Sequence, residues 1–294
     1  MASPLPSPAA ARVGVVTVSY GSGAVLSPLL RSLESASVNR LAVVVADNRA
    51  NEPESVADIA AEHGVGYVAM DGNRGYGAAI NAATASLPPG IEWILVVNPD
   101  VVLLPGSIDE LVAAGDADAA IGSVGPQTRT LEGNVYPSAR AVPSLRTGVG
   151  HALFVNLWLE NPWTRAYRND VTTEPIRRDA GWLSGACVLV RRAVFDELGG
   201  FDEGYFMYFE DVDLGYRIGK AGYRNVYEPS AVATHTGAHS TNSDSDRMIA
   251  AHHESARRFL NRKYAGIWLW PVRVTLTIGL QLRSALVRRR ANRQ

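Results

Sequence analysis

The chain has 294 residues, of which 47% are hydrophobic and 19% charged, and its formal net charge is −1. This composition can bury a full hydrophobic core, and the length suits one large α/β domain, alone or with an appendage. The near-zero net charge excludes the strong overall field that attracts proteins to nucleic acid.

Residues 1–11 are rich in Pro, Ala and Ser and predict a disordered lead-in. No apolar stretch of signal-peptide length precedes the first predicted strand, which indicates a cytoplasmic protein. The one cysteine, Cys187, lies within an apolar run at residues 186–190, so no disulfide can form within the chain. We interpret Cys187 as a small buried apolar residue rather than a reactive thiol.

The first hundred residues alternate between strand-like and helix-like segments. Strands are predicted at residues 13–19, 41–46, 65–70 and 93–97, with helices at 24–35, 53–63 and 76–86. This alternation is typical of a parallel sheet covered by helices. Ligands of such sheets bind beyond the carboxyl ends of the strands, so the polar residues there should share one crevice. These residues are Ser19 and Tyr20, Asp47 and Asn48, residues 71–74 and residues 98–100.

The second half of the sequence is less regular. Its predicted elements are a strand at residues 119–124, a turn-rich excursion at 127–138, an interrupted helix at 146–167 and a buried strand at 181–191. A helix at 209–221, a strand at 223–227 and a long helix at 244–264 follow.

The motif Asn98-Pro99-Asp100 directly follows the predicted strand at residues 93–97. Pro99 restricts the backbone of the turn, and Asp100 supplies a hard oxygen ligand for a divalent cation. Turns are rich in all three residue types, so the motif alone favours a surface turn. Two further features, the glycine-rich residues 73–77 and the acidic residues 209–214, favour a binding site.

Asp47 follows the second predicted strand, where an acid in a nucleotide-binding sheet often contacts the ribose or base. A cap or turn role is an equal alternative. The segment Asn73-Arg74-Gly75-Tyr76-Gly77 precedes a predicted helix, and its glycines allow the backbone to approach an anionic ligand at the helix N-terminus. It is not the dinucleotide-binding fingerprint, which follows the first strand.

Three acids, Glu210, Asp211 and Asp213, begin the predicted helix at residues 209–221. Residues 210 and 213 share a helix face and Asp211 points elsewhere, while Asp213 can pair with Arg217. Acids in a first turn are also favourable for the helix dipole. The apolar residues 205–209 beside them predict a partly dry crevice, in which one carboxylate can act as a general base.

Two histidines, His235 and His239, lie in the loop at residues 234–240. An imidazole there could complete a metal site begun by Asp100. A structural or merely exposed histidine is the alternative at both positions.

Five segments occur in an order and spacing that resemble the inverting family 2 glycosyltransferases of the GT-A fold. They are residues 73–77, 98–100, 181–185, 209–214 and 226–235. Residues 135–140, 161–164 and 205–208 are similar to the bacterial rhamnosyltransferases that build the cell-wall linker of mycobacteria-like organisms. The resemblance implies an α/β GT-A domain with a mixed central sheet over residues 12–240. Residues 241–294 are expected to form a separate, basic, membrane-associating helical segment.

The resemblance further implies transfer of L-rhamnose from dTDP-L-rhamnose to a GlcNAc-diphosphoryl-polyprenol acceptor, in one inverting step. Asp211 would be the general base, and Asp100 and His235 would hold Mg²⁺ or Mn²⁺ against the donor diphosphate. The donor nucleotide sugar would lie along Ser19, Tyr20, Asp47, Asn73, Gly75, Tyr76, Asn81, Asn98 and Asp100. The acceptor would contact Trp182, Leu183, Ser184, Gly185, Glu210 and His239.

The chain departs from the family pattern at two places. Asn98 stands where the metal motif usually begins with Asp, and residues 49–51 differ from the Gly or Ala, then Ser, that often follow Asp47-Asn48. One alternative is a family 2 transferase with another donor or a polysaccharide acceptor. A second is a non-catalytic sugar-nucleotide-binding module. A sugar-nucleotide pyrophosphorylase is disfavoured because residues 20–24 contain no basic side chain.

The C-terminal segment is basic: ten Arg or Lys residues and no acid follow Glu254. The apolar residues Leu269, Val272, Leu276, Leu280 and Val287 share one helical face, beside Trp268, Trp270, Arg273, Arg283 and residues 288–290. No run reaches the ~20 apolar residues of a spanning helix. We therefore expect an interfacial helix at the cytoplasmic face of the membrane; the alternative is a helix packed on the protein's own core. A homodimer is compatible with the sequence.

Overall fold

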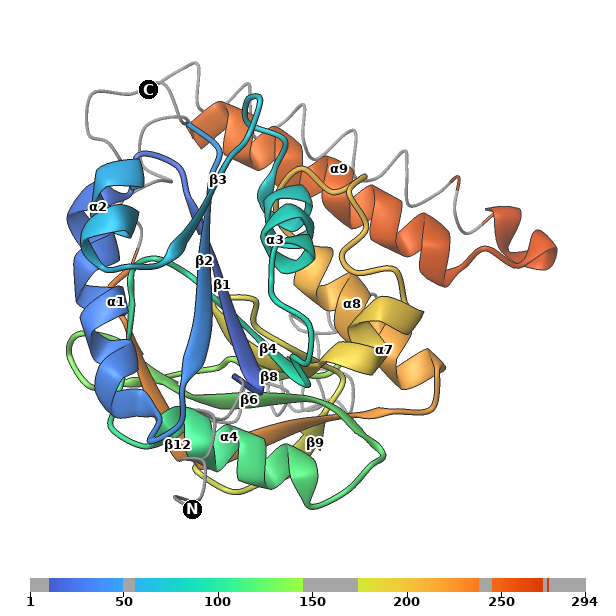
Figure 1. The fold of residues 1–294 in the computed structure, drawn as a ribbon. Helices are drawn as coiled ribbons and strands as arrows, with labels where there is room; N and C mark the ends of the chain where they lie inside the picture. The colour runs from blue at the N-terminus through green and yellow to red at the C-terminus, as the bar shows by residue number, and fades with distance from the viewer. Residues whose placement is uncertain (1–10, 50–55, 145–173, 238–244, 272–273, 275–294) are drawn as a thin grey trace, which may run out of the picture.

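A computed structural model describes residues 11–49, 56–144, 174–237, 245–271 and 274. Ten strands form one mixed sheet, whose order is β3-β2-β1-β4-β11-β6-β12-β5 with β7 paired to β6 and β9 paired to β12 (Figure 1). The strands are β1 (Val13–Ser19), β2 (Leu41–Asp47), β3 (Gly66–Ala69), β4 (Trp93–Val97), β5 (Val101–Leu103), β6 (Ile121–Arg129), β7 (Val135–Tyr136), β9 (Arg178–Ala180), β11 (Cys187–Arg191) and β12 (Arg224–His235). The short strands β8 (Ala139–Arg140) and β10 (Trp182–Leu183) form a separate antiparallel pair.

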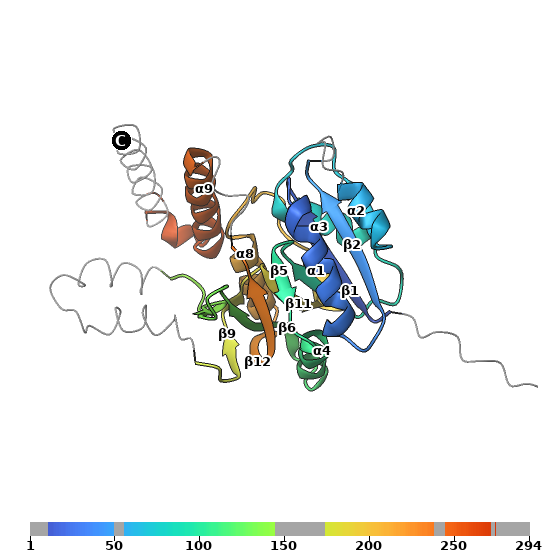
Figure 2. The same ribbon diagram turned by 90° about the vertical axis from the view of Figure 1, so that its left-hand side faces the viewer.

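Helices cover both faces of the large sheet (Figures 1 and 2). The helices are α1 (Gly23–Ala36), α2 (Val56–Glu62), α3 (Tyr76–Ala85), α4 (Ser107–Asp116), α7 (Arg192–Glu197), α8 (Glu210–Lys220) and α9 (Ser245–Lys263), followed by the 3₁₀ turn η1 (Ile267–Leu269). Side chains of α1, α2 and α4 pack on one face with Val15, while those of α3, α7 and α8 pack on the other with Val16. All seven residues of β1 are buried, as a strand covered on both faces requires.

Strand direction explains how distant segments reach the same edge. Strands β3, β2, β1 and β4 run parallel, but β11 is antiparallel to β4, with Cys187 opposite Val97 and Arg191 opposite Trp93. The residues that precede β11 therefore lie beside the residues that follow β4.

The predicted elements of the first hundred residues agree with the structure to within a few residues, as do α8 and α9. The second half was less well predicted. The predicted strand at 181–191 is two strands separated by residues 184–186, and the excursion at 127–138 contains the end of β6 and all of β7. Strand β12 runs on to His235, and β5, α4 and α7 were not predicted. The helix expected at 146–167 lies outside the described residues.

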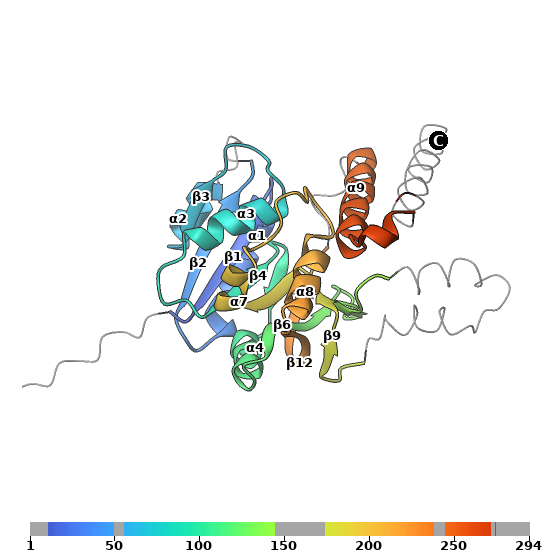
Figure 3. The ribbon, with the colours of Figure 1, turned by 90° about the vertical axis from the view of Figure 1, so that its right-hand side faces the viewer.

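Helix α9 lies beyond α8, away from the large sheet (Figures 2 and 3). Its residue Phe259 is fully buried in a third apolar cluster with Tyr205 and Val212. No helix in the described ranges combines the length and the apolar character needed to cross a bilayer.

Candidate active site

The first part of the site is the edge of the sheet where β1 and β2 end. Ser19 is buried, and its hydroxyl oxygen accepts a hydrogen bond from the Ser22 amide at 3.3 Å. Asp47 is 3% exposed; its Oδ1 accepts from the Arg49 amide at 3.0 Å and its Oδ2 from the Tyr67 hydroxyl at 3.1 Å. These bonds fix the carboxylate beyond the strand end. The Arg49 guanidinium lies 5.1 Å from the ring centroid of the partly exposed Tyr20, so Arg49, one of the departures from the family pattern, contacts a predicted site residue.

The second part of the site is the glycine-rich loop at residues 73–77, which is fixed from two directions. Asn73 Oδ1 accepts from the Gly75 amide, and Asn48 Nδ2 donates to the Gly75 carbonyl, both at 3.1 Å. Gly75 has φ +91°, and a Cβ atom there would lie 2.3 Å from the Phe206 carbonyl oxygen, so only glycine fits. The same oxygen accepts a hydrogen bond from the Tyr76 amide at 3.1 Å, which joins this loop to the segment that precedes α8.

Two predicted site residues hold the scaffold instead of facing the crevice. The side-chain amide of Asn81 donates to the Phe201 carbonyl and accepts from the Phe201 amide, both at 2.9 Å. Leu183 is only 4% exposed and belongs to the core cluster on the α3 and α8 face. We therefore assign neither side chain to substrate contact.

The third part is a carboxylate–imidazole pair. Asp100 Oδ1 and His235 Nε2 are 3.1 Å apart, and the two side chains are 11% and 24% exposed. Thr236 donates two hydrogen bonds to the Asp100 carbonyl, from its amide and its hydroxyl, each 3.0 Å long. The backbone amide of Asn98 donates a hydrogen bond to the Ala186 carbonyl at 2.9 Å, which places the turn at residues 98–100 beside the start of β11.

This pair suits a divalent cation that is shared with an anionic ligand. One carboxylate oxygen and one imidazole nitrogen converge, and both are common ligands of first-row divalent ions. Within the described ranges no group of three or more His, Cys, Asp or Glu side chains could hold a metal alone. His239 lies outside the described residues.

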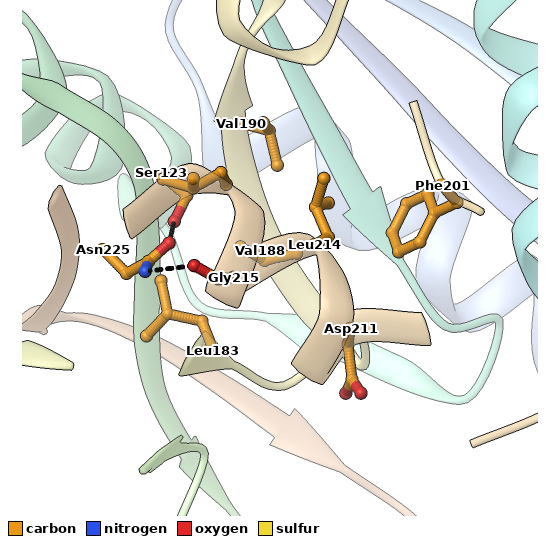
Figure 4. Close-up of a pocket in the computed structure, with 10 residues that line it drawn as sticks. Ser123, Leu183, Val188, Val190, Phe201, Asp211, Leu214, Gly215 and Asn225 are labelled. Atoms are coloured by element: carbon orange, nitrogen blue, oxygen red, sulfur yellow. Dashed lines mark hydrogen bonds between the residues drawn. The ribbon is translucent and has the colours of Figure 1, made fainter. Parts of the chain in front are cut away.

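Asp211 lies at the start of α8 and faces the backbone at Gly185. The Gly185 amide donates to Asp211 Oδ2 at 2.9 Å, and the Val212 amide donates to Oδ1 at 2.8 Å. Figure 4 shows the carboxylate directed away from Leu214 and Val188. Burial raises the pKa of Asp211, although the two backbone hydrogen bonds oppose the increase. A carboxylate in this setting is a stronger base than one in water.

Glu210 precedes Asp211 in the first turn of α8. It is buried, and its Oε2 has no hydrogen-bond partner in the part of the chain that the structure describes. Burial, and then the charge of Asp211, raises the pKa of Glu210 to about 8. Two adjacent buried carboxyls cannot both ionise readily. The backbone donors stabilise the charge on Asp211, which favours Glu210 as the protonated member of the pair.

The loop before β11 completes this wall of the site. Tyr76 donates its hydroxyl to the Gly185 carbonyl at 2.9 Å, and burial raises the pKa of this phenol, so it stays protonated. Half-buried Trp182 donates its indole nitrogen to the Ala141 carbonyl at 3.1 Å, and the Ser184 hydroxyl oxygen accepts from the Ala186 amide at 3.3 Å. The contacts of Tyr76 and Phe206 were not predicted, because each joins segments far apart in the sequence.

A small cavity behind Asp211 is not the substrate site. Its volume is about 10 Å³, which is room for one water molecule at most. The lining includes Ser123 and Asn225, which hydrogen-bond at 2.7 Å, and Asn225 also donates to the Gly215 carbonyl (Figure 4). The Asp211 carboxylate is directed to the other side, toward the Gly185 amide.

Comparison with known proteins gives consistent results. The family described as "Glycosyltransferase like family 2" matches residues 9–254. The N-acetylglucosaminyl-diphospho-decaprenol L-rhamnosyltransferase of Mycobacterium tuberculosis (strain H37Rv) is 44% identical over 95% of this chain and 94% of its own length. The rhamnosyltransferase WbbL of Escherichia coli (strain K12) is 27% identical over 85% of this chain and 93% of its own.

A similar solved structure is a mannosyltransferase from Pyrobaculum calidifontis, in complex with GDP-Man and Mn²⁺. Its TM-score is 0.56 at 17% identity, and the match covers 95% of this chain and 73% of the mannosyltransferase. At that identity the likeness concerns the fold, which is the GT-A glycosyltransferase arrangement.

Proposed function

Since the chain belongs to glycosyltransferase family 2, we propose that it transfers L-rhamnose from dTDP-L-rhamnose to a GlcNAc-diphosphoryl-polyprenol acceptor. The observation that carries this proposal is the 44% identity, over 95% of the chain, to an enzyme named for that acceptor and that sugar. The product would belong to the linker of cell-wall arabinogalactan.

On the donor side, Ser19, Tyr20, Asp47, Asn73, Gly75 and Tyr76 would lie along the nucleotide sugar, with Asn98 at the metal turn. The close pairing of Asp100 with His235 supports their role as ligands of Mg²⁺ or Mn²⁺, and the mannosyltransferase with the same fold was solved with Mn²⁺. Such an ion offsets the charge that develops on the leaving nucleotide diphosphate.

Asp211 would be the general base. In a single in-line displacement, its carboxylate takes the proton of the acceptor hydroxyl while that oxygen bonds to the anomeric carbon of rhamnose. The bond from the anomeric carbon to the diphosphate breaks with its electrons going to the departing nucleotide, so the configuration inverts. The hydrogen bond from Gly185 to Asp211 supports this role, because it fixes the direction of the carboxylate.

The acceptor would bind between Trp182, Ser184, Gly185 and Glu210. Glu210, neutral because its pKa is raised to about 8, offers a hydroxyl donor to the acceptor sugar. Its position next to Asp211 in the first turn of α8 supports this role.

The C-terminal segment would place the enzyme on the cytoplasmic face of the membrane, where a polyprenyl acceptor resides. Ile267, Trp268 and Trp270 are 76%, 91% and 59% exposed, which supports an outward-facing apolar surface rather than packing on the core. Exposed tryptophans beside a basic sequence are typical of interfacial segments. The rest of the predicted face and its arginines lies at residues 272–273 and 275–294, outside the described residues.

The test is incubation of the purified protein with dTDP-[¹⁴C]rhamnose, Mg²⁺ and a GlcNAc-diphosphoryl lipid. We expect a lipid-linked disaccharide with inverted anomeric configuration. Transfer of another sugar from a panel of nucleotide sugars would replace the donor in the proposal. Donor binding without transfer to any lipid or polysaccharide acceptor would instead support a non-catalytic binding module.

A further inference from the structure

The backbone directly before the carboxyl pair is strained. Tyr208 and Phe209 have φ of 68° and 66°, and among the described residues they are the only non-glycine positions with positive φ. A left-handed backbone is unfavourable for any residue with a Cβ, and for a bulky aromatic residue it persists only when the surroundings hold it. Helix α8 begins at the next residue, Glu210, so this turn sets where Glu210 and Asp211 lie.

Helix α9 supplies the contacts on this turn. The ring of Phe209 lies 5.7 Å from Phe259 and 5.4 Å from His252, and the Tyr208 ring lies 5.5 Å from His252. The buried Ser255 donates its hydroxyl to the Met207 carbonyl at 2.8 Å. Three side chains of α9 thus hold three successive residues of the turn.

Ion pairs fix α9 on both sides of the turn. Arg258 contacts Asp202 at 2.7 Å, before the turn, and Arg262 contacts the fully buried Asp213 at 2.7 Å, after it. Breaking the contacts of a buried charge such as Asp213 is costly. Helix α9 therefore spans the whole segment that leads into the site.

The opposite side of the same segment contacts the donor loop. The Phe206 carbonyl accepts the Tyr76 amide, and no Cβ fits between it and Gly75. The segment at residues 202–213 thus lies between the glycine-rich loop and α9.

We propose that α9 is a positioning element for the reaction, with Phe259 and Ser255 as positioning residues. By holding Tyr208 and Phe209 in the left-handed conformation, α9 keeps Asp211 against Gly185 and in line with the bound donor. This inference rests on the proposed role of Asp211 as the base. Phe259 and Ser255 are both buried, so they act through the turn that they contact.

The test compares four variants of the full chain with the unmodified protein. Phe259→Ala removes the packing on Phe209, Ser255→Ala removes one hydroxyl, and Phe259→Leu keeps most of the apolar volume. Arg257→Ala is the matched control, because Arg257 forms an i,i+3 pair with Glu254 on the same helix, with side chains 38% and 63% exposed. We expect kcat to fall at least ~5-fold in both alanine variants of the turn contacts, with the donor KM unchanged. Phe259→Leu should recover most of kcat.

Amide hydrogen exchange provides a readout that does not require activity. In Phe259→Ala and Ser255→Ala, exchange of peptides covering residues 205–213 should increase several-fold, with β1 and β4 unchanged. Should those amides stay protected in both variants, or should Arg257→Ala lower kcat as much as Ser255→Ala, the positioning role is overturned. If the unmodified protein transfers no sugar, the proposed function fails, but the exchange data still decide whether α9 holds the turn.

Discussion

His235 Nε2 lies 3.1 Å from Asp100 Oδ1, although the two residues are 135 positions apart. Strand pairing causes this contact, because β12 runs antiparallel to β5 with His235 opposite Val101. The last strand of the sheet is thereby joined to the turn that follows β4.

Removing either member of this pair should weaken metal-dependent donor binding. We expect Asp100→Ala and His235→Ala each to raise the Kd of dTDP-rhamnose at least ~10-fold in the presence of Mg²⁺. The double variant should be little worse than either single one, because both ligands serve one ion. Calorimetric titration with and without Mg²⁺ measures the effect, with His63→Ala, directly after α2, as the control. Activity that survives exhaustive treatment with a chelator would contradict the metal site.

Asp211→Asn should retain the fold and the donor affinity but lose turnover. Asparagine is nearly isosteric but cannot accept the acceptor proton, so we expect kcat to fall by at least ~10²-fold. Steady-state transfer assays measure this, with Asp196→Asn, which alters an exposed carboxylate on α7, as the control. Near-normal turnover in Asp211→Asn would assign the base to another group.

Glu210 should make activity decline at alkaline pH. The pKa of Glu210 is raised to about 8. Above that pH, Glu210 loses the proton that it would offer to the acceptor in our proposal. Its carboxylate then also places a second negative charge beside Asp211. In Glu210→Gln, which stays neutral, kcat/KM should no longer fall near pH 8. Rate profiles from pH 6 to 9 with the unmodified protein and this variant provide the measurement, and an unchanged alkaline limb would refute the assignment.

The same group predicts how stability depends on pH. The pKa of Glu210 is higher in the folded protein, at about 8, than its ordinary value of 4.5, so the folded state binds the extra proton in this window. Its contribution to the free energy of unfolding is full below pH 4.5 and is lost as pH rises through 8. Urea unfolding at pH 6 and pH 9 should therefore show a smaller loss of stability in Glu210→Gln than in the unmodified protein.

The exposed apolar residues after α9 should bind anionic membranes. We expect the full chain to sediment with anionic liposomes and a chain truncated after Lys263 to stay in the supernatant. Changing both Trp268 and Trp270 to Ser should reduce binding, because tryptophan side chains favour the membrane interface. Val38→Ser is the control, since Val38 is 94% exposed but lies between α1 and β2. Equal partitioning of the full and truncated chains, at low and high salt, would exclude the anchor.

The sequence was most informative where periodicity and local pairing decide the structure. The buried runs of β1 and β4 and the start of α8 were predictable, and the predicted pair of Asp213 with Arg217 is confirmed at 2.6 Å. Strand β5 was missed because three residues carry too little pattern. Helix α4 was also not predicted, although the sequence contains an amphipathic pattern for it. Ile108, Leu111 and Ala114 recur at helical spacing and are buried.

The site was only partly predictable, for a physical reason. The sequence indicated Asp100 through a strand end and His235 as a loop histidine, and it indicated Asp211 through an acid cluster and the family resemblance. It did not indicate the contact of Gly75 with Phe206 or that of Asp211 with Gly185, because both depend on tertiary packing. The left-handed turn was also not predictable, since aromatic residues normally avoid positive φ.

The reversed direction of β11 has an evolutionary consequence. In our proposal, the residues that contact the donor precede residue 101, except for His235. The chain then returns to the same edge with residues 181–185 and α8, which would face the acceptor. The two substrates would then be recognised by separate stretches of one gene. Descendants of a common ancestor could exchange one stretch and acquire a new acceptor while they keep the inherited donor.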